Sequence, residues 1–136
     1  MADRYFTLEE ANAALTVVRP IAERLVELRT RLRDALARRE TLQSTIGGNG
    51  GGLTASDLVE LDAEVEQLGN AVGTCVARIH AAGAQVKDLD TGLLDFPGLR
   101  EGREILYCWR VGEAEIGFWH GLDEGFAGRK PIDVVE

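Results

Sequence analysis

Two long segments of the chain repeat their apolar residues with the spacing of an α-helix. In the first segment, steps of four and three residues connect Ile21, Leu25, Leu28, Leu32, Ala35, Arg39 and Leu42, of which only Arg39 is not apolar. In the second segment, the same steps connect Leu58, Leu61, Val65, Leu68, Val72, Cys75, Ile79 and Ala82. Because side chains at this spacing share one stripe of a helix, each segment is predicted to be a helix whose seam packs against a partner.

The first helix is predicted over residues 7–46. Thr7 and Glu10 have the spacing of a capping box, in which each side chain accepts a hydrogen bond from a free backbone N–H at the helix start. Pro20 lies inside this helix and cannot donate a hydrogen bond to the carbonyl four residues before it. The helix is therefore predicted to be either kinked or broken near Pro20.

The second helix is predicted over residues 54–83, and the glycine-rich residues 47–53 connect the two helices. A phosphate-binding loop would follow a strand and would continue into Gly-Lys-Ser or Gly-Lys-Thr. Here the glycines follow a helix and are followed by Leu53-Thr54-Ala55. We therefore interpret them as a flexible connector between two antiparallel helices.

Beyond residue 83 the apolar runs become shorter and are separated by turn residues, which predicts a β-rich region over residues 84–136. Within it, residues 104–109 and 116–120 are predicted to form a hairpin that turns at Gly112 and Glu113.

The predicted hairpin has a definite register. Arg110 is expected opposite Glu115, and Cys108 is expected opposite Gly117. Because side chains alternate between the faces of a strand, this register would place Cys108 and His120 on opposite faces of the sheet.

The chain is thus predicted to be one α+β domain over residues 1–136, in which a long antiparallel helical hairpin packs with a small antiparallel β-sheet in the C-terminal third. Two helices leave apolar surface exposed beside their seam, and the sheet or a second copy of the chain must cover it. Since a second copy would complete a four-helix arrangement of coiled-coil character, a homodimer is predicted.

The net charge and the lengths of the apolar runs limit the kinds of partner that the protein is expected to bind. The 136 residues carry a net charge of −8, which opposes binding to nucleic acid or to an anionic membrane because both need clustered Lys and Arg. No apolar run approaches the roughly 20 residues that cross a bilayer, and the N-terminal residues lack the apolar stretch of a signal peptide. We therefore expect a cytoplasmic location, with Cys75 and Cys108 as reduced thiols.

Short motifs at both ends of the chain point to a known family. Residues 6–12 form one of them. The motifs of the C-terminal third are Val86-Lys87-Asp88, Gly92-Leu93-Leu94-Asp95-Phe96-Pro97, Cys108-Trp109-Arg110, Trp119-His120 and Gly125-Phe126-Ala127-Gly128-Arg129. Through these motifs the chain resembles a bacterial family known as a domain of unknown function (DUF 2203). The resemblance covers nearly the whole chain and implies family membership, but it implies no activity.

The same region holds the residues best suited to metal binding. The candidate ligands are His120, Asp123, Asp95 and Glu124, because an imidazole with carboxylates suits Zn or Fe. A thiolate would favour Zn, but the predicted register turns Cys108 away from His120. A divalent metal, Zn or Fe, is therefore a candidate cofactor. The alternative is that His120 only closes its strand by hydrogen bonding to a loop carboxylate or a backbone carbonyl.

Acid–base catalysis by His120 with Asp95 or Asp123 is a second hypothesis, since histidine titrates near neutrality and a carboxylate can orient it. A nucleophilic pair of Cys108 and His120 is disfavoured, because Cys108 between Tyr107 and Trp109 is expected to be buried.

A third hypothesis is a ligand site made by Asp95, Arg110, Trp119, His120 and Arg129, in which arginine binds an anion and tryptophan forms an aromatic wall. The leading prediction is therefore a binding or interaction module for a small ligand or a protein partner, with its site in the C-terminal third. A small metal-dependent enzyme that uses the same residues is the alternative, and a coiled-coil-like scaffold is the third choice.

Overall fold

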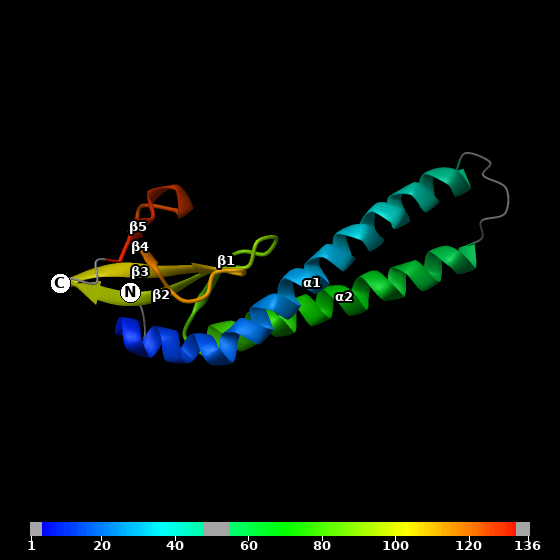
Figure 1. Ribbon diagram of the computed structural model, residues 1–136. Coiled ribbons are helices and arrows are strands. Elements are labelled where there is room, and N and C mark those ends of the chain that lie inside the picture. Colours follow the sequence, from blue (N-terminus) through cyan, green and yellow to red (C-terminus); the bar gives the residue numbers. More distant parts are fainter. Residues whose placement is uncertain (1–3, 48–54, 133–136) are drawn as a thin grey trace.

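The computed structural model describes residues 4–47 and 55–132, which form two helices followed by a five-stranded sheet (Figure 1). Helix α1 spans Leu8–Gly47, helix α2 spans Ala55–Ala81, and the two pack against each other. The predicted α+β fold is thereby confirmed. Most of the predicted glycine connector, with Thr54, lies outside the described residues.

The start of α1 has the predicted capping box. The Thr7 N–H donates to Glu10 Oε1 at 2.9 Å, and the Glu10 N–H donates to Thr7 Oγ1 at 3.0 Å. Further along, α1 continues through Pro20 without a break, and Figure 1 shows the helix changing direction in its N-terminal half. The structure therefore has the kink rather than the break, because one missing hydrogen bond bends a helix whose neighbouring turns stay intact.

The predicted seams form the contact between the helices. Leu25 and Leu28 of α1 are buried in the same core as Val72 and Ile79 of α2. Apolar burial along both stripes drives this association, at about 25 cal/mol for each Å² removed from water. The local helical pattern thus correctly predicts which face each helix buries.

One part of the helical hairpin extends beyond the sheet. Arg29 of α1 forms an ion pair with Asp90, in the turn after the first strand, at 3.0 Å. Beyond this level, residues 34–47 and 55–68 run away from the sheet (Figure 1), and we call them the arm.

The sheet is an antiparallel meander in which each strand pairs with its neighbours in sequence. Its strands are β1 (Gln85–Asp88), β2 (Leu93–Arg100), β3 (Arg103–Arg110), β4 (Phe118–Gly121) and β5 (Lys130–Pro131). A short 3-10 helix, η1 (Phe126–Gly128), lies between β4 and β5 in the chain.

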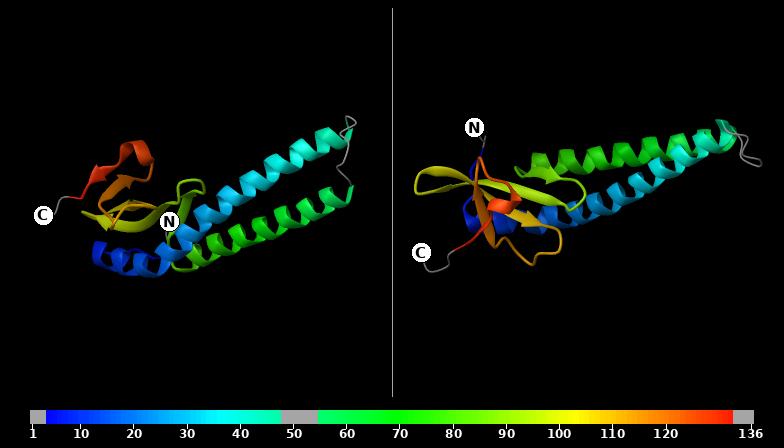
Figure 2. Two further views of the ribbon diagram at one scale, coloured as in Figure 1. Left: turned by 45° about the vertical axis from the view of Figure 1, so that its right-hand side comes forward. Right: turned by 90° about the horizontal axis from the view of Figure 1, so that it is seen from above.

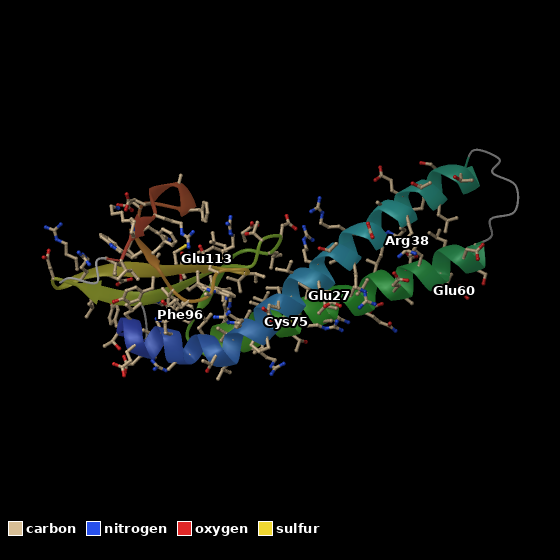
Figure 3. The ribbon with its side chains drawn as sticks, viewed as in Figure 1. Glu27, Arg38, Glu60, Cys75, Phe96 and Glu113 are labelled. Atoms are coloured by element: carbon tan, nitrogen blue, oxygen red, sulfur yellow. The ribbon has the colours of Figure 1, made fainter. Side chains whose placement is uncertain are left out.

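The two faces of the sheet have different coverings. Leu94, Phe96 and Trp109 share a core with Leu15 and Val18 of α1, and Figure 3 shows Phe96 on the side of the sheet that faces α1. The segment around η1 lies on the other side of the sheet, as Figures 1 and 2 show. Side chains that alternate with Trp109 and Phe96 along β3 and β2 therefore point toward this C-terminal segment.

The register predicted for the hairpin is wrong by one residue. In the structure Cys108 is opposite Phe118 and Leu106 is opposite His120, whereas Cys108 was expected opposite Gly117. A slip of one residue moves every side chain of a strand to the other face. Cys108 and His120 consequently lie on the same face of the sheet.

Tertiary contacts of the loop between β3 and β4 explain this register. The Trp109 indole N–H donates to the Glu113 carbonyl at 3.0 Å, which folds the loop back onto β3. Ile116, expected to begin the second arm of the hairpin, is buried in the core instead, and its N–H donates to Asn12 Oδ1 of α1 at 2.9 Å. These contacts keep residues 111–117 out of the sheet, so that β4 begins later than predicted.

Neither helix, within the described residues, is long and apolar enough to cross a membrane. The homodimer expected from the seams stays a prediction.

Candidate metal centre

Three buried side chains with metal-binding chemistry meet on the face of the sheet that lies away from α1. Asp95 of β2, Cys108 of β3 and His120 of β4 are 1%, 0% and 3% exposed. One ligand atom from each lies within 4.8 Å of the other two, and among the described residues this is the group that could hold a metal ion. Because Asp95 is directly opposite Cys108 in the sheet, the pairing of β2 with β3 itself brings two of the donors together.

The hydrogen bonds of His120 define where its protons lie. Its Nδ1 is 2.8 Å from the Gly121 carbonyl, which can only accept, so Nδ1 carries a proton. Its Nε2 is 3.0 Å from Asp95 Oδ1, and these two atoms hold one proton between them. The ring is thus fixed in orientation, and Nε2 is the nitrogen that faces Asp95.

The Cys108 thiol is not activated by its protein surroundings. Burial, followed by the nearby charge of Asp95, raises its pKa to about 12, although Arg129 opposes the shift. The thiol therefore stays protonated near neutrality and is a poor nucleophile, since the thiolate is the reactive form. Bound metal would reverse this, because a coordinating thiol is deprotonated outright.

The donor set matches that of a zinc-class ion. Zn²⁺ is held by sulfur of Cys, nitrogen of His and oxygen of Asp, and sites with three protein donors keep a fourth position for another ligand. Metal-binding histidines usually donate their second ring N–H to a carbonyl or carboxylate, and the Nδ1–H of His120 does so to Gly121. Cys108, which the predicted register places on the opposite face from His120, is the third member of this donor set.

A cavity of about 270 Å³ borders two of the three donors, and Cys108 is not part of its lining. Asp95 and His120 line it, together with Lys87, Leu93, Leu106, Leu122, Glu124, Gly125 and Phe126. The cavity lies between the sheet and the C-terminal segment, so a ligand inside it could reach Asp95 and His120.

A second cluster, centred on Arg129, packs next to the three donors. The Arg129 guanidinium carbon is 4.1 Å from the centre of the Phe118 ring and 4.6 Å from that of Phe126. Its Nη2 donates to Glu113 Oε1 at 2.7 Å and to the Cys108 carbonyl at 3.2 Å. Arg129 was predicted to bind a ligand, but its charge is already paired by Glu113, which sequence reasoning had placed only in a turn.

The other predicted site residues lie outside the three-donor cluster. Asp123 is exposed. Glu124 lines the cavity, where it accepts the Gly121 N–H at 2.8 Å and the Lys130 ammonium at 2.6 Å. Of the predicted ligands, the structure therefore joins only Asp95 and His120 to the cluster.

Trp119 and Arg110, two other predicted site residues, make contacts outside the three-donor cluster. Trp119 precedes His120 in β4 and therefore points to the other face of the sheet, where Arg100 and Lys130 lie 4.8 and 4.7 Å from its ring centre. Arg110 does not face Glu115 as expected, and its guanidinium carbon lies 4.9 Å from the centre of the Phe126 ring.

A larger hollow, of about 530 Å³, lies between the helices of the arm. Arg38 and Glu64, which line it, form an ion pair across the helices at 2.7 Å. Its lining contains no His or Cys, so we place the candidate site at the smaller cavity.

We expect the pair of Glu113 and Arg129 to make stability depend on pH. Burial raises the pKa of Glu113, but the hydrogen bonds from Arg129 and the Arg110 N–H, with the charges of both arginines, outweigh it and hold the pKa below its usual value. A lowered pKa stabilises the fold above the usual value of about 4.3, and this stabilisation is lost as the pH falls through the folded-state pKa. Glu113→Gln should therefore lower the free energy of unfolding by about 1–3 kcal/mol at pH 7 and by much less at an acidic pH below the folded-state pKa.

Urea denaturation at the two pH values checks this expectation. Glu115→Gln, which alters the exposed acid that was expected to pair with Arg110, is the matched control and should change little at either pH. An equal loss at both pH values in Glu113→Gln would show that the carboxylate charge does not contribute.

The comparisons with known proteins agree with the motifs. A family model described as an uncharacterized conserved protein (DUF2203) matches residues 4–132. No curated protein and no solved structure matches the chain. The matched region includes both helices, all five strands and the three donors. The chain therefore belongs to the DUF2203 family of uncharacterized conserved proteins.

Proposed function

We propose that the protein binds a divalent metal ion of the zinc class through Asp95, Cys108 and His120, and that it binds a small ligand in the adjoining cavity. The convergence of three buried donors of different chemistry beside a cavity is the observation that supports this function. Zinc is favoured over iron because a thiolate is a soft ligand. An ion held by three protein donors would keep a position that a ligand in the cavity can occupy.

A small metal-dependent enzyme is the second candidate. The position left for a further ligand favours it, since catalytic zinc sites are built from three protein donors. Cysteine-based catalysis without metal is less well supported, because the pKa of Cys108 is raised to about 12. A scaffold made only of helices would not explain a buried Asp, Cys and His on the sheet.

The proposal includes a cytoplasmic location. Cys75 and Cys108 are both free and buried, and free thiols persist in compartments that keep cysteine reduced. A reduced Cys108 is required if it is to bind the ion.

The test combines elemental analysis of protein purified without an affinity tag with Co²⁺ titration of the metal-free protein. We expect near-stoichiometric zinc, and we expect bound Co²⁺ to give the charge-transfer band of a cobalt–thiolate bond. Cys108→Ser should abolish that band, and His120→Gln should weaken Co²⁺ binding by at least about a hundredfold, because even the outer partners of metal ligands are worth 10–100-fold.

The chain provides matched controls, because it has two cysteines and two histidines. Cys75→Ser changes a buried thiol in the helical core, and His80→Gln changes an exposed imidazole. Both should keep the band and the affinity. Circular dichroism of each variant separates a lost ligand from a lost fold. Protein that binds neither zinc nor Co²⁺, or a band that survives in Cys108→Ser, would contradict the proposed centre.

A further inference from the structure

The walls of the cavity beside Asp95 and His120 include four large apolar side chains and are partly open to water. These side chains are Leu93, Leu106, Leu122 and Phe126. Leu122 and Phe126 are 53% and 41% exposed, so both have apolar surface that a ligand could cover. Apolar side chains that gather at the mouth of a cavity are typical of a surface that a ligand or partner covers.

The charged groups of the cavity leave one cation without a partner. Glu124 is neutralised by Lys130, whose ammonium lies 2.6 Å from its carboxylate. Lys87, at the exposed edge of the cavity, has no hydrogen bond or ion pair with any described residue. The negative charges of the Asp95 carboxylate and of a Cys108 thiolate would together balance the two positive charges of a bound divalent ion. The loaded cavity would then carry a net charge of about +1, contributed by Lys87.

The volume of the cavity suits a small ligand. At about 270 Å³ it is close to the lower end of the range of small-molecule sites, about 300–1,000 Å³. One positive charge matches a monoanion better than a phosphate, which carries more charge near neutrality.

We infer that the ligand is a small organic carboxylate with a short apolar chain, an inference that rests on the proposed metal centre. The carboxylate binds between the ion and the Lys87 ammonium, and the chain covers Leu122 and Phe126. Charge complementarity fixes the head group, and burial of the two exposed side chains favours the tail.

Titration of the Co²⁺-loaded protein with hexanoate tests the inference. Hexanoate has eight non-hydrogen atoms and fits the volume, and its binding should shift the visible absorption bands of the cobalt ion in a saturable way. Hexanol and hexylamine have the same chain without the negative charge, and acetate has the charge without the chain. Each should bind at least about tenfold more weakly than hexanoate.

Lys87→Gln should weaken hexanoate binding about tenfold or more and leave Co²⁺ affinity unchanged, since a hydrogen bond to a charged group is worth about that factor. Arg78→Gln removes one positive charge from α2, outside the cavity lining, and should leave both affinities unchanged. Equal binding of hexanol and hexanoate, or unaltered hexanoate binding by Lys87→Gln, would overturn the inference while the metal centre stands. Failure to bind Co²⁺ would overturn the proposed function, and the inference with it.

Discussion

Replacing Asp95 by alanine should lower the free energy of unfolding of the metal-free protein by about 3–5 kcal/mol. Asp95 is 1% exposed, and its Oδ1 shares a proton with His120 Nε2 at 3.0 Å. Removing one member of a buried pair leaves the other without a partner and without water, which is why such changes cost more than the pair itself contributes. Urea denaturation at pH 7 in the presence of a chelator measures the loss.

Two further variants show whether the loss of stability comes from the missing hydrogen bond to His120 or from removing any carboxylate near the cavity. Asp95→Asn keeps an amide N–H that can donate a hydrogen bond to His120 Nε2, so it should cost clearly less than Asp95→Ala. Asp123→Ala removes an exposed carboxylate near the cavity and should change stability by no more than about 0.5 kcal/mol. A loss of less than 1 kcal/mol in Asp95→Ala would show that water replaces the carboxylate and that the pair is not sealed.

The second large effect is expected on the other face of the sheet. Trp109 is completely buried between the sheet and α1, and its indole N–H is satisfied by the Glu113 carbonyl. Trp109→Ala should lower the free energy of unfolding by about 3–5 kcal/mol, because it leaves a cavity and an unpaired carbonyl. The same urea denaturation at pH 7 measures it.

Trp119→Ala is the matched control for this change. Trp119 is only partly buried and contacts Arg100 and Lys130 through its ring. Its loss should cost about 1 kcal/mol, close to the value of exposed cation–π contacts. Similar costs for the two tryptophans would show that the sheet and α1 do not form the tight core described above.

The helices could be predicted from the sequence because their signals are local. A seam of apolar residues, a capping box and a proline each act within a turn or two, and the structure places Leu25, Val72 and the Thr7–Glu10 pair as expected. Asp95 also had a local signal, since a carboxylate within an apolar strand must find a partner when it is buried.

The register of β4 had no local signal. Whether Cys108 or Tyr107 shares a face with His120 depends on Ile116, which the Asn12 side chain of a distant helix holds out of the sheet. Periodicity along a strand cannot show such a contact, and an error of one residue was enough to exclude Cys108 from the centre. The pairing of Glu113 with Arg129 was missed for the same reason, because it joins two loops that are distant in the sequence.

All three donors come from β2, β3 and β4, and the arm contributes none of them. An insertion of one heptad in each helix would preserve the apolar seam and lengthen the arm by about 10 Å, at 1.5 Å per residue. The length of the arm can therefore change without moving any of the three donors, because the arm and the donor cluster are built from different elements.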